Sequence, residues 1–168
     1  MSVIAAKVYP DRIDIASDSI LIKEDTKKTN FKKIYNTAHI CAGGCGSAEE
    51  LSLFFSFISG HKPEEESVTG VLNFMKSFSK WKFEYTNDDV IHNCYIIIFR
   101  KKLFEVDGLF VQEIKDYTAI GEGEDFAMAA LHLGHTVKEA VQVACDLSCY
   151  VSAPIACYNV MFKEKQNK

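Results

Sequence analysis

The sequence predicts a single α+β domain over residues 1–168, with groups of strands and pairs of helices following one another along the chain. Apolar and polar residues alternate on both sides of a Pro-Asp turn near the N-terminus, as in a hairpin. Apolar residues recur at helical spacing in residues 67–82. Residues 95–99 are apolar throughout, which is typical of a strand buried on both faces. No repeat or linker divides the chain, and residues 163–168 are predicted to be a solvated tail.

Turn residues and alternation define the expected strands. Pro10-Asp11 separates the first two runs, so the second strand should return beside the first and bring Asp18 close to the N-terminus in space. Residues 23–30 are predicted to be a polar loop. Lys101-Lys102 and Asp107-Gly108 turn later runs that are rich in β-branched and aromatic residues. The strands are expected at residues 2–9, 12–17, 31–34, 93–100, 103–106, 109–114 and 155–162.

Capping patterns and apolar stripes define the expected helices. Ser47 to Glu50 and Thr136 to Glu139 both read as capping boxes at a helix start, and Gly60 ends the first helix. The stripe in residues 67–82 is interpreted as a core-facing side rather than a cofactor site. The helices are expected at residues 49–59, 67–82, 125–133 and 136–149.

The composition limits the partners of the chain. A net charge of −4 without a basic stripe argues against nucleic acid. The chain has no run of about 18 apolar residues to span a membrane and no secretory signal, so we expect a cytoplasmic protein. The six cysteines form no Cys-x-x-Cys pair and are interpreted as buried free thiols. The sequence therefore predicts neither a metal site nor a cofactor.

Ser2 is the first candidate for catalysis. Met1 precedes a small residue, and this context favours removal of the initiator methionine. Ser2 would then carry a hydroxyl and a free α-amine, which titrates near ~8. One residue would supply both nucleophile and general base. The competing interpretation is an edge strand that simply begins near the N-terminus.

Asp18 and one lysine are candidates for supporting Ser2. A lysine delivered beside Asp18 and the terminal hydroxyl would lower the hydroxyl pKa and stay charged through its pairing with the aspartate. Lys32 and Lys33 are adjacent in an expected strand, where side chains alternate faces, so only one of them can point toward Ser2. The residues themselves do not decide which, and each is otherwise a solvated lysine at a strand edge.

Five segments match the motifs of one family, in order and at the right separations. They are Ser2, Ile15–Ser19, Lys32–Ile34, the glycine-rich Ala42–Glu49 and Ala119–Gly123. Over residues 2–162 the chain resembles the proteasome β-subunit and HslV group of N-terminal-nucleophile hydrolases. The resemblance implies a four-layer αββα sandwich, with two antiparallel sheets packed face to face and a helix pair outside each. It also implies an endopeptidase acting on peptides or unfolded proteins.

The resemblance assigns roles to particular residues. Ser2 is the implied nucleophile, and Asp18 and Lys33 are the implied electrostatic supports. A backbone N–H near Cys45, within residues 43–46, is the implied oxyanion donor, with the exact donor left open. Ser152 falls on the serine of a later Asp-x-x-Ser motif, where the chain has lost the aspartate.

The resemblance also implies self-assembly. Together with the apolar helix stripes, it predicts a homo-oligomer of stacked rings with about six or seven subunits each. The chain has no Walker-type phosphate loop, so an ATPase unfoldase would be a separate chain.

The chain departs from the family pattern at two places that bear on activity. Serine in place of threonine removes the γ-methyl that fixes the hydroxyl rotamer. Glu122 follows Ala-Ile-Gly where the family often has serine, and a carboxylate there would raise the pKa of the amine. The alternative function is therefore a catalytically silent scaffold or shell subunit of the same fold.

Overall fold

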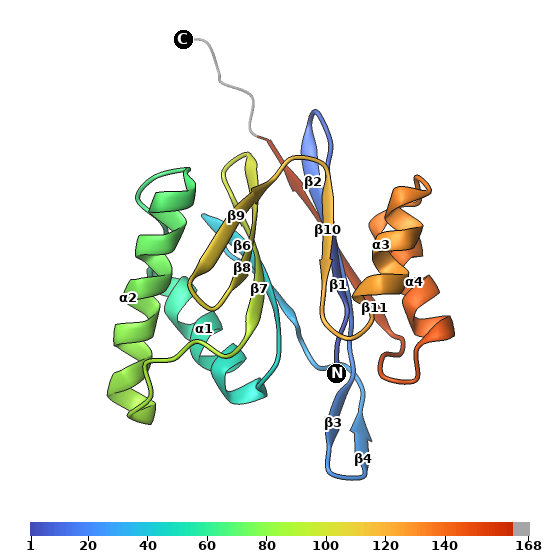
Figure 1. Ribbon diagram of the computed structural model, residues 1–168, viewed down its shortest axis with the longest axis horizontal. Coiled ribbons are helices and arrows are strands. Elements are labelled where there is room, and N and C mark those ends of the chain that lie inside the picture. The colour runs from blue at the N-terminus through green and yellow to red at the C-terminus, as the bar shows by residue number, and fades with distance from the viewer. Residues whose placement is uncertain (163–168) are drawn as a thin grey trace.

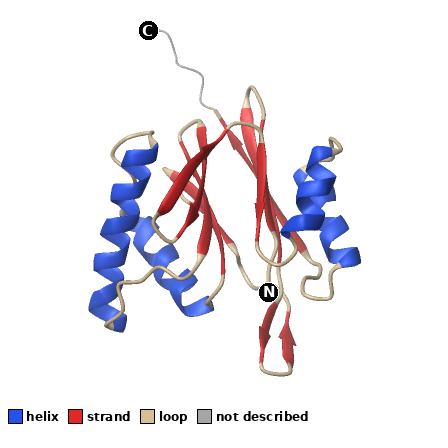
Figure 2. Ribbon diagram, in the orientation of Figure 1, coloured by secondary structure: helices blue, strands red, loops and turns tan. Residues whose placement is uncertain are grey.

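The chain folds into four layers, as the computed structural model shows over residues 1–162 (Figure 1). Two antiparallel sheets face each other, and a pair of helices covers the outer side of each sheet (Figure 2). The predicted α+β sandwich is confirmed. The tail expected at residues 163–168 lies outside the described residues.

The first sheet contains both ends of the described chain. Its strand order is β10-β1-β2-β11. Ala5 of β1 lies opposite Ala16 of β2 on one side and Ala119 of β10 on the other, so the predicted N-terminal hairpin is present. The short strand β10 was not predicted. The strands span Ile4–Val8 (β1), Arg12–Asp18 (β2), Tyr117–Ile120 (β10) and Ile155–Met161 (β11).

The second sheet has the order β5-β6-β7-β8-β9, with the apolar strand β7 buried at its centre as predicted. The strand expected at residues 31–34 begins only at Ile34, so Lys33 lies just before it. The glycine-rich segment is itself a strand, β6, before it turns into a helix. The strands span Ile34–Asn36 (β5), Ile40–Cys45 (β6), Cys94–Phe99 (β7), Lys102–Asp107 (β8) and Phe110–Ile114 (β9).

The polar loop expected at residues 23–30 is wrong in part. Leu21–Lys23 (β3) and Thr26–Lys28 (β4) form a small hairpin that extends away from the sandwich near the N-terminus (Figure 1). Glu24 takes a left-handed conformation in its turn, with φ of 53°. All three residues of Thr26–Lys28 are exposed, so burial imposes no apolar alternation on this strand and the sequence looks like a loop.

The four helices begin and end close to the predicted residues. They span Ala48–Gly60 (α1), Val68–Thr86 (α2), Glu124–His132 (α3) and Val137–Leu147 (α4). The capping box at Thr136 is present. Ser47 caps α1, but the Glu50 side chain does not complete a capping box there, because it makes buried contacts elsewhere. Within residues 1–162, no helix combines the length and apolarity needed to cross a membrane.

Three clusters of buried side chains separate the four layers. The one between the sheets is rich in isoleucine, including Ile4, Ile15 and Ile96. Aromatic rings dominate the cluster under α1 and α2, whereas small alanine side chains dominate the one under α3 and α4. The N-terminus lies where the two sheets meet, at the end of the sandwich that carries the β3–β4 hairpin (Figure 1).

Candidate active site

Ser2 is buried just before β1, with 6% of its surface exposed. Its hydroxyl donates to the Met1 carbonyl oxygen at 2.6 Å. The Gly123 N–H donates to the Ser2 carbonyl oxygen at 3.2 Å. Gly121 has φ of +95°, and a Cβ there would lie 2.5 Å from the same oxygen, so this close approach requires glycine. The Ala-Ile-Gly-x-Gly motif therefore holds the Ser2 backbone in place.

Asp18 ends β2 and is fully buried. Its carboxylate accepts from the Val3 N–H at 2.9 Å and from the Ile20 N–H at 3.3 Å. Both of its oxygens also accept from Lys33 Nζ, at 2.9 and 2.8 Å. Asp18 thereby connects the residue after Ser2 to the Lys33 ammonium.

Lys33 points inward, and 2% of it is exposed. Its Nζ also donates to the Met1 carbonyl oxygen at 3.2 Å, the oxygen that the Ser2 hydroxyl contacts. Burial lowers the pKa of Lys33, against the opposing effect of the Asp18 charge. The neighbouring Lys32 instead places its Nζ over the exposed side of Tyr35, 4.3 Å from the ring centroid. Of the two lysines, Lys33 is the one that reaches the Met1–Ser2 peptide.

A glycine turn closes the site. Gly44, Cys45 and Gly46 line a small cavity of about 60 Å³. Ser2 and Lys33 line the same cavity. A Cβ on Gly44 would lie 2.7 Å from both Leu51 and Tyr95, so the strand needs glycine here. A hydrogen bond with Cys94 and burial raise the pKa of the Cys45 thiol, so this thiol stays protonated and is a poor nucleophile.

Two further residues flagged in the sequence contact groups other than Ser2, Asp18 and Lys33. Glu122 Oε2 is 3.5 Å from the Met1 amine, on a half-exposed side chain. Ser152 Oγ accepts from Lys27 Nζ at 2.7 Å. Among the hydrogen bonds of residues 1–162, none joins Ser152 to Ser2, Asp18 or Lys33.

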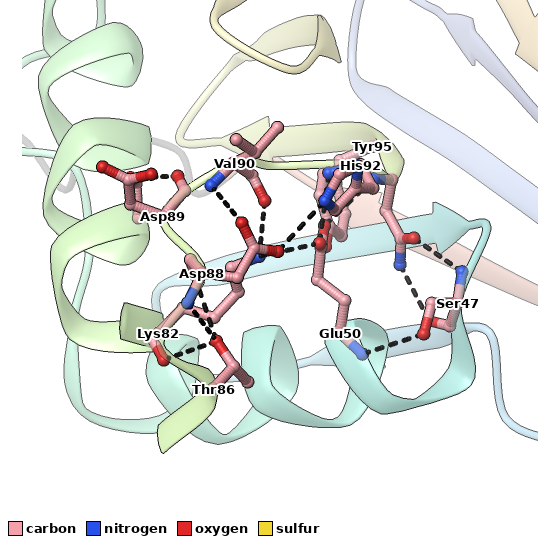
Figure 3. A network of polar contacts seen from close by, with 11 residues as sticks. Ser47, Glu50, Lys82, Thr86, Asp88, Asp89, Val90, His92 and Tyr95 are labelled. Carbon is pink, nitrogen blue, oxygen red and sulfur yellow. Dashed lines mark hydrogen bonds and ion pairs between the residues drawn. The ribbon is translucent and has the colours of Figure 1, made fainter. Parts of the chain in front are cut away.

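Sequence patterns did not predict a second buried polar network, which lies around Glu50 in the first turn of α1 (Figure 3). Glu50 at its centre accepts from Lys82, and Asn93 contacts Ser47. One signal was available. Lys82 stands four residues after Phe78 on the apolar stripe of its helix, where a lysine is buried only with a partner. Glu50 itself had been assigned to a capping box.

The sequence matches no family model and no curated protein. Solved structures share its fold. BPH of Thiobacillus denitrificans in complex with epoxomicin superposes with a TM-score of 0.85 at 17% identity, covering 96% of this chain and 100% of that chain. BPH of the same organism in another structure gives 0.83 at 20% identity, with coverage of 96% and 98%. HslV from Trypanosoma brucei gives 0.69 at 16% identity, with coverage of 95% and 99%. The chain thus has the same fold as these BPH and HslV structures.

Proposed function

We propose that this chain is an N-terminal-nucleophile peptidase in which Ser2, once Met1 is removed, attacks the peptide bond. The observation that carries the proposal is the buried Asp18–Lys33 pair, whose ammonium is aimed at the Met1–Ser2 peptide beside a glycine turn. A charged pair enclosed in this way is costly to bury, and such pairs gather where chemistry needs them. The shared fold of the HslV-like structures supports the same conclusion.

The reaction needs only groups of this chain and water. The Ser2 α-amine takes the hydroxyl proton, and Oγ attacks the carbonyl carbon of the substrate. The Lys33 ammonium stabilises the developing negative charge on Oγ, and Asp18 holds that ammonium in place. The amine then returns its proton to the leaving nitrogen, and water hydrolyses the acyl-serine by the same route.

The oxyanion donor lies in the glycine turn, and we assign it to Gly46. The Gly44 N–H already donates to the Lys33 carbonyl oxygen at 3.1 Å. Successive N–H groups along a strand point to opposite edges, so the Cys45 N–H faces β7, where Cys94 is its partner. The Gly46 N–H follows on the same edge as that of Gly44, past the start of β5. This refines the position near Cys45 that the sequence suggested.

Self-assembly into stacked rings, with peptides or unfolded proteins as substrates, belongs to the same proposal. The HslV-like structures support it, as do the large apolar side chains that this chain exposes on its helices, among them Phe83 of α2 and Leu147 of α4. An ATPase partner would be a separate chain. If Met1 is retained, the Ser2 nitrogen is an amide that cannot act as a base, and the chain is a silent subunit of the same fold.

The test begins with the intact mass of the purified protein, which shows whether Met1 is present. Hydrolysis of fluorogenic peptides is then compared among the parent, Ser2→Ala and Ser2→Thr, with the exposed Ser52→Ala as matched control. Ser2→Ala should abolish turnover, while Ser2→Thr and Ser52→Ala stay active. A Ser2→Ala variant that cleaves peptides at the parental rate would refute the proposal.

A further inference from the structure

We infer that Asn93 is a positioning residue that fixes the oxyanion turn. The inference rests on the proposed function, because it concerns the donor that this reaction needs. Asn93 lies just before β7 and is 1% exposed. It is 46 residues from Ser47 in sequence, yet its side chain is hydrogen-bonded to the Ser47 backbone. It touches no reacting atom and acts through the backbone of Gly46 and Ser47.

The side-chain amide of Asn93 makes two hydrogen bonds to one residue. Its Oδ1 accepts from the Ser47 N–H at 2.6 Å, and its Nδ2 donates to the Ser47 carbonyl oxygen at 2.9 Å. Ser47 is also the N-cap of α1, where its Oγ accepts from the Glu50 N–H. The peptide that joins Gly46 to Ser47 is therefore held on its N–H side by an oriented, buried amide, which leaves it little freedom to rotate.

Gly46 and Asn93 fit each other sterically. Gly46 has φ of +127°, a conformation that residues with side chains rarely adopt. A Cβ on Gly46 would lie 2.1 Å from Asn93 Oδ1 and 3.2 Å from Asn93 Cα. The space that a side chain would need is thus occupied by the group that holds the turn. Glycine is therefore required at this position both by the backbone torsion and by the Asn93 side chain, whose two bonds to Ser47 we call the clamp.

Glu50 anchors the clamp from behind (Figure 3). Its Oε1 accepts from the Asn93 N–H at 3.0 Å and from the Tyr95 hydroxyl at 2.9 Å. Its Oε2 accepts from the His92 N–H at 3.1 Å and from Lys82 Nζ at 3.2 Å. Glu50 belongs to the first turn of α1, directly after the glycine turn. The turn, Asn93 and α1 thus form a closed ring of contacts.

The Gly46 N–H belongs to the preceding peptide, which is joined to the held Gly46–Ser47 peptide through the Gly46 Cα. Holding that peptide therefore restricts the direction of the Gly46 N–H in the cavity that Gly46 and Ser2 both line. An oxyanion donor acts when it is held in place before charge develops. Freeing the Gly46–Ser47 peptide should therefore slow the chemical step and leave substrate binding almost unchanged. The expected result is a fall in kcat at constant KM.

The test compares Asn93→Ala and Asn93→Asp with Tyr95→Phe, which removes one contact to Glu50 and keeps both Asn93–Ser47 bonds. For folded Asn93→Ala we expect kcat to fall about 10- to 100-fold, within the cost of losing an oxyanion donor, with KM changed less than about twofold. Asn93→Asp keeps the acceptor for the Ser47 N–H but loses the donor to its carbonyl, so its kcat should be intermediate. If Asn93→Ala does not fold, the kcat of Asn93→Asp tests the positioning role of Asn93 instead. Tyr95→Phe should keep the parental kcat.

Hydrogen exchange of the Gly46 and Ser47 amides supplies a readout that needs no activity. Exchange of the Ser47 amide should accelerate most in Asn93→Ala, less in Asn93→Asp, which keeps the acceptor for this N–H, and not in Tyr95→Phe. Unchanged exchange and unchanged kcat in a folded Asn93 variant would overturn the inference, as would an equal loss of kcat in Tyr95→Phe. Failure of the proposed function looks different, because Ser2→Ala would then retain turnover while the exchange rates still report on the clamp.

Discussion

Within residues 1–162, two lysine–carboxylate pairs are buried, one on each side of the five-stranded sheet. Lys33 pairs with Asp18 where the two sheets meet, and Lys82 pairs with Glu50 between that sheet and its helices. All four residues are at most 5% exposed. Chemically the pairs are almost the same. They differ in where the remaining hydrogen bonds of each ammonium go.

All the hydrogen-bond contacts of Lys82 Nζ are to groups that stay in the mature chain. Besides Glu50, its Nζ contacts the Asp88 carboxylate and the Val90 carbonyl oxygen. Lys33 gives its third contact to the Met1 carbonyl, which belongs to the residue that we expect to be removed. After that removal Lys33 would have a donor to spare beside Ser2. The Lys33–Asp18 pair is therefore a candidate for catalysis, because removal of Met1 would free one N–H donor of Lys33 to contact a reacting atom.

The largest expected effect is on stability, in Lys82→Met. The change leaves the Glu50 charge buried without its partner, and breaking a buried pair in this way costs about 3–5 kcal/mol of unfolding free energy. Urea denaturation measures this cost. Turnover per folded molecule should stay within about twofold of the parent, since Lys82 does not line the Ser2 cavity. A loss below about 1 kcal/mol would show that the His92 and Asn93 N–H groups and the Tyr95 hydroxyl hold the Glu50 carboxylate without Lys82.

Lys33→Met should lose a similar amount of stability and, unlike Lys82→Met, should also lose turnover. We expect kcat per folded molecule to fall about 10²–10³-fold, the size of an oriented electrostatic contribution in a closed site. Peptide hydrolysis at low temperature, corrected for the folded fraction, makes the comparison, with Lys82→Met as the matched control. Equal turnover in the two variants would remove the distinction drawn between the pairs.

The smallest effect is a divergence between turnover and stability at high pH. Because burial lowers the pKa of Lys33, turnover should fall on the alkaline side at a pH below 10.5, as the ammonium loses its proton. Between the lowered pKa and 10.5 the unfolded chain binds more protons at this site than the folded one. The free energy of unfolding, measured relative to Lys33→Met, should therefore rise with pH in that window. Rate profiles and urea denaturation at matched pH test this, and a parallel fall of both would contradict it.

Local patterns foretold most of the fold. Alternation around Pro10-Asp11 predicted the hairpin that returns Asp18 to the N-terminus, and the structure has that hairpin. The apolar run of β7 predicted a central strand, because a strand that is buried on both faces needs apolar side chains at successive positions. The β3–β4 hairpin was missed because its second strand is exposed. The short strand β10 was missed because four residues carry little periodicity.

The sequence predicted only those site residues that belong to a recognisable family motif. Family resemblance named Ser2, Asp18 and Lys33, and the structure brings these three together around the Met1–Ser2 peptide. As expected, only one of the two adjacent lysines reaches the site, although Lys33 lies just before β5 and not within it. The clamp on the glycine turn joins residues more than 40 positions apart through side-chain contacts. No periodicity records such pairings, so they emerge only once the layers are assembled.

Two backbone hydrogen bonds, at the Ser2 carbonyl and the Val3 N–H, lower the conformational entropy of the chain end before any reaction. Chain ends usually fray, and a reactive group on a fraying end must be ordered anew in each cycle. Here the Ser2 carbonyl is held by Gly123, and the Val3 N–H that follows is held by Asp18. Neither contact involves Met1, so its removal would leave both intact. The backbone of the terminal nucleophile would thus be immobile before substrate binds. The entropy cost of ordering it would arise during folding and not at the transition state.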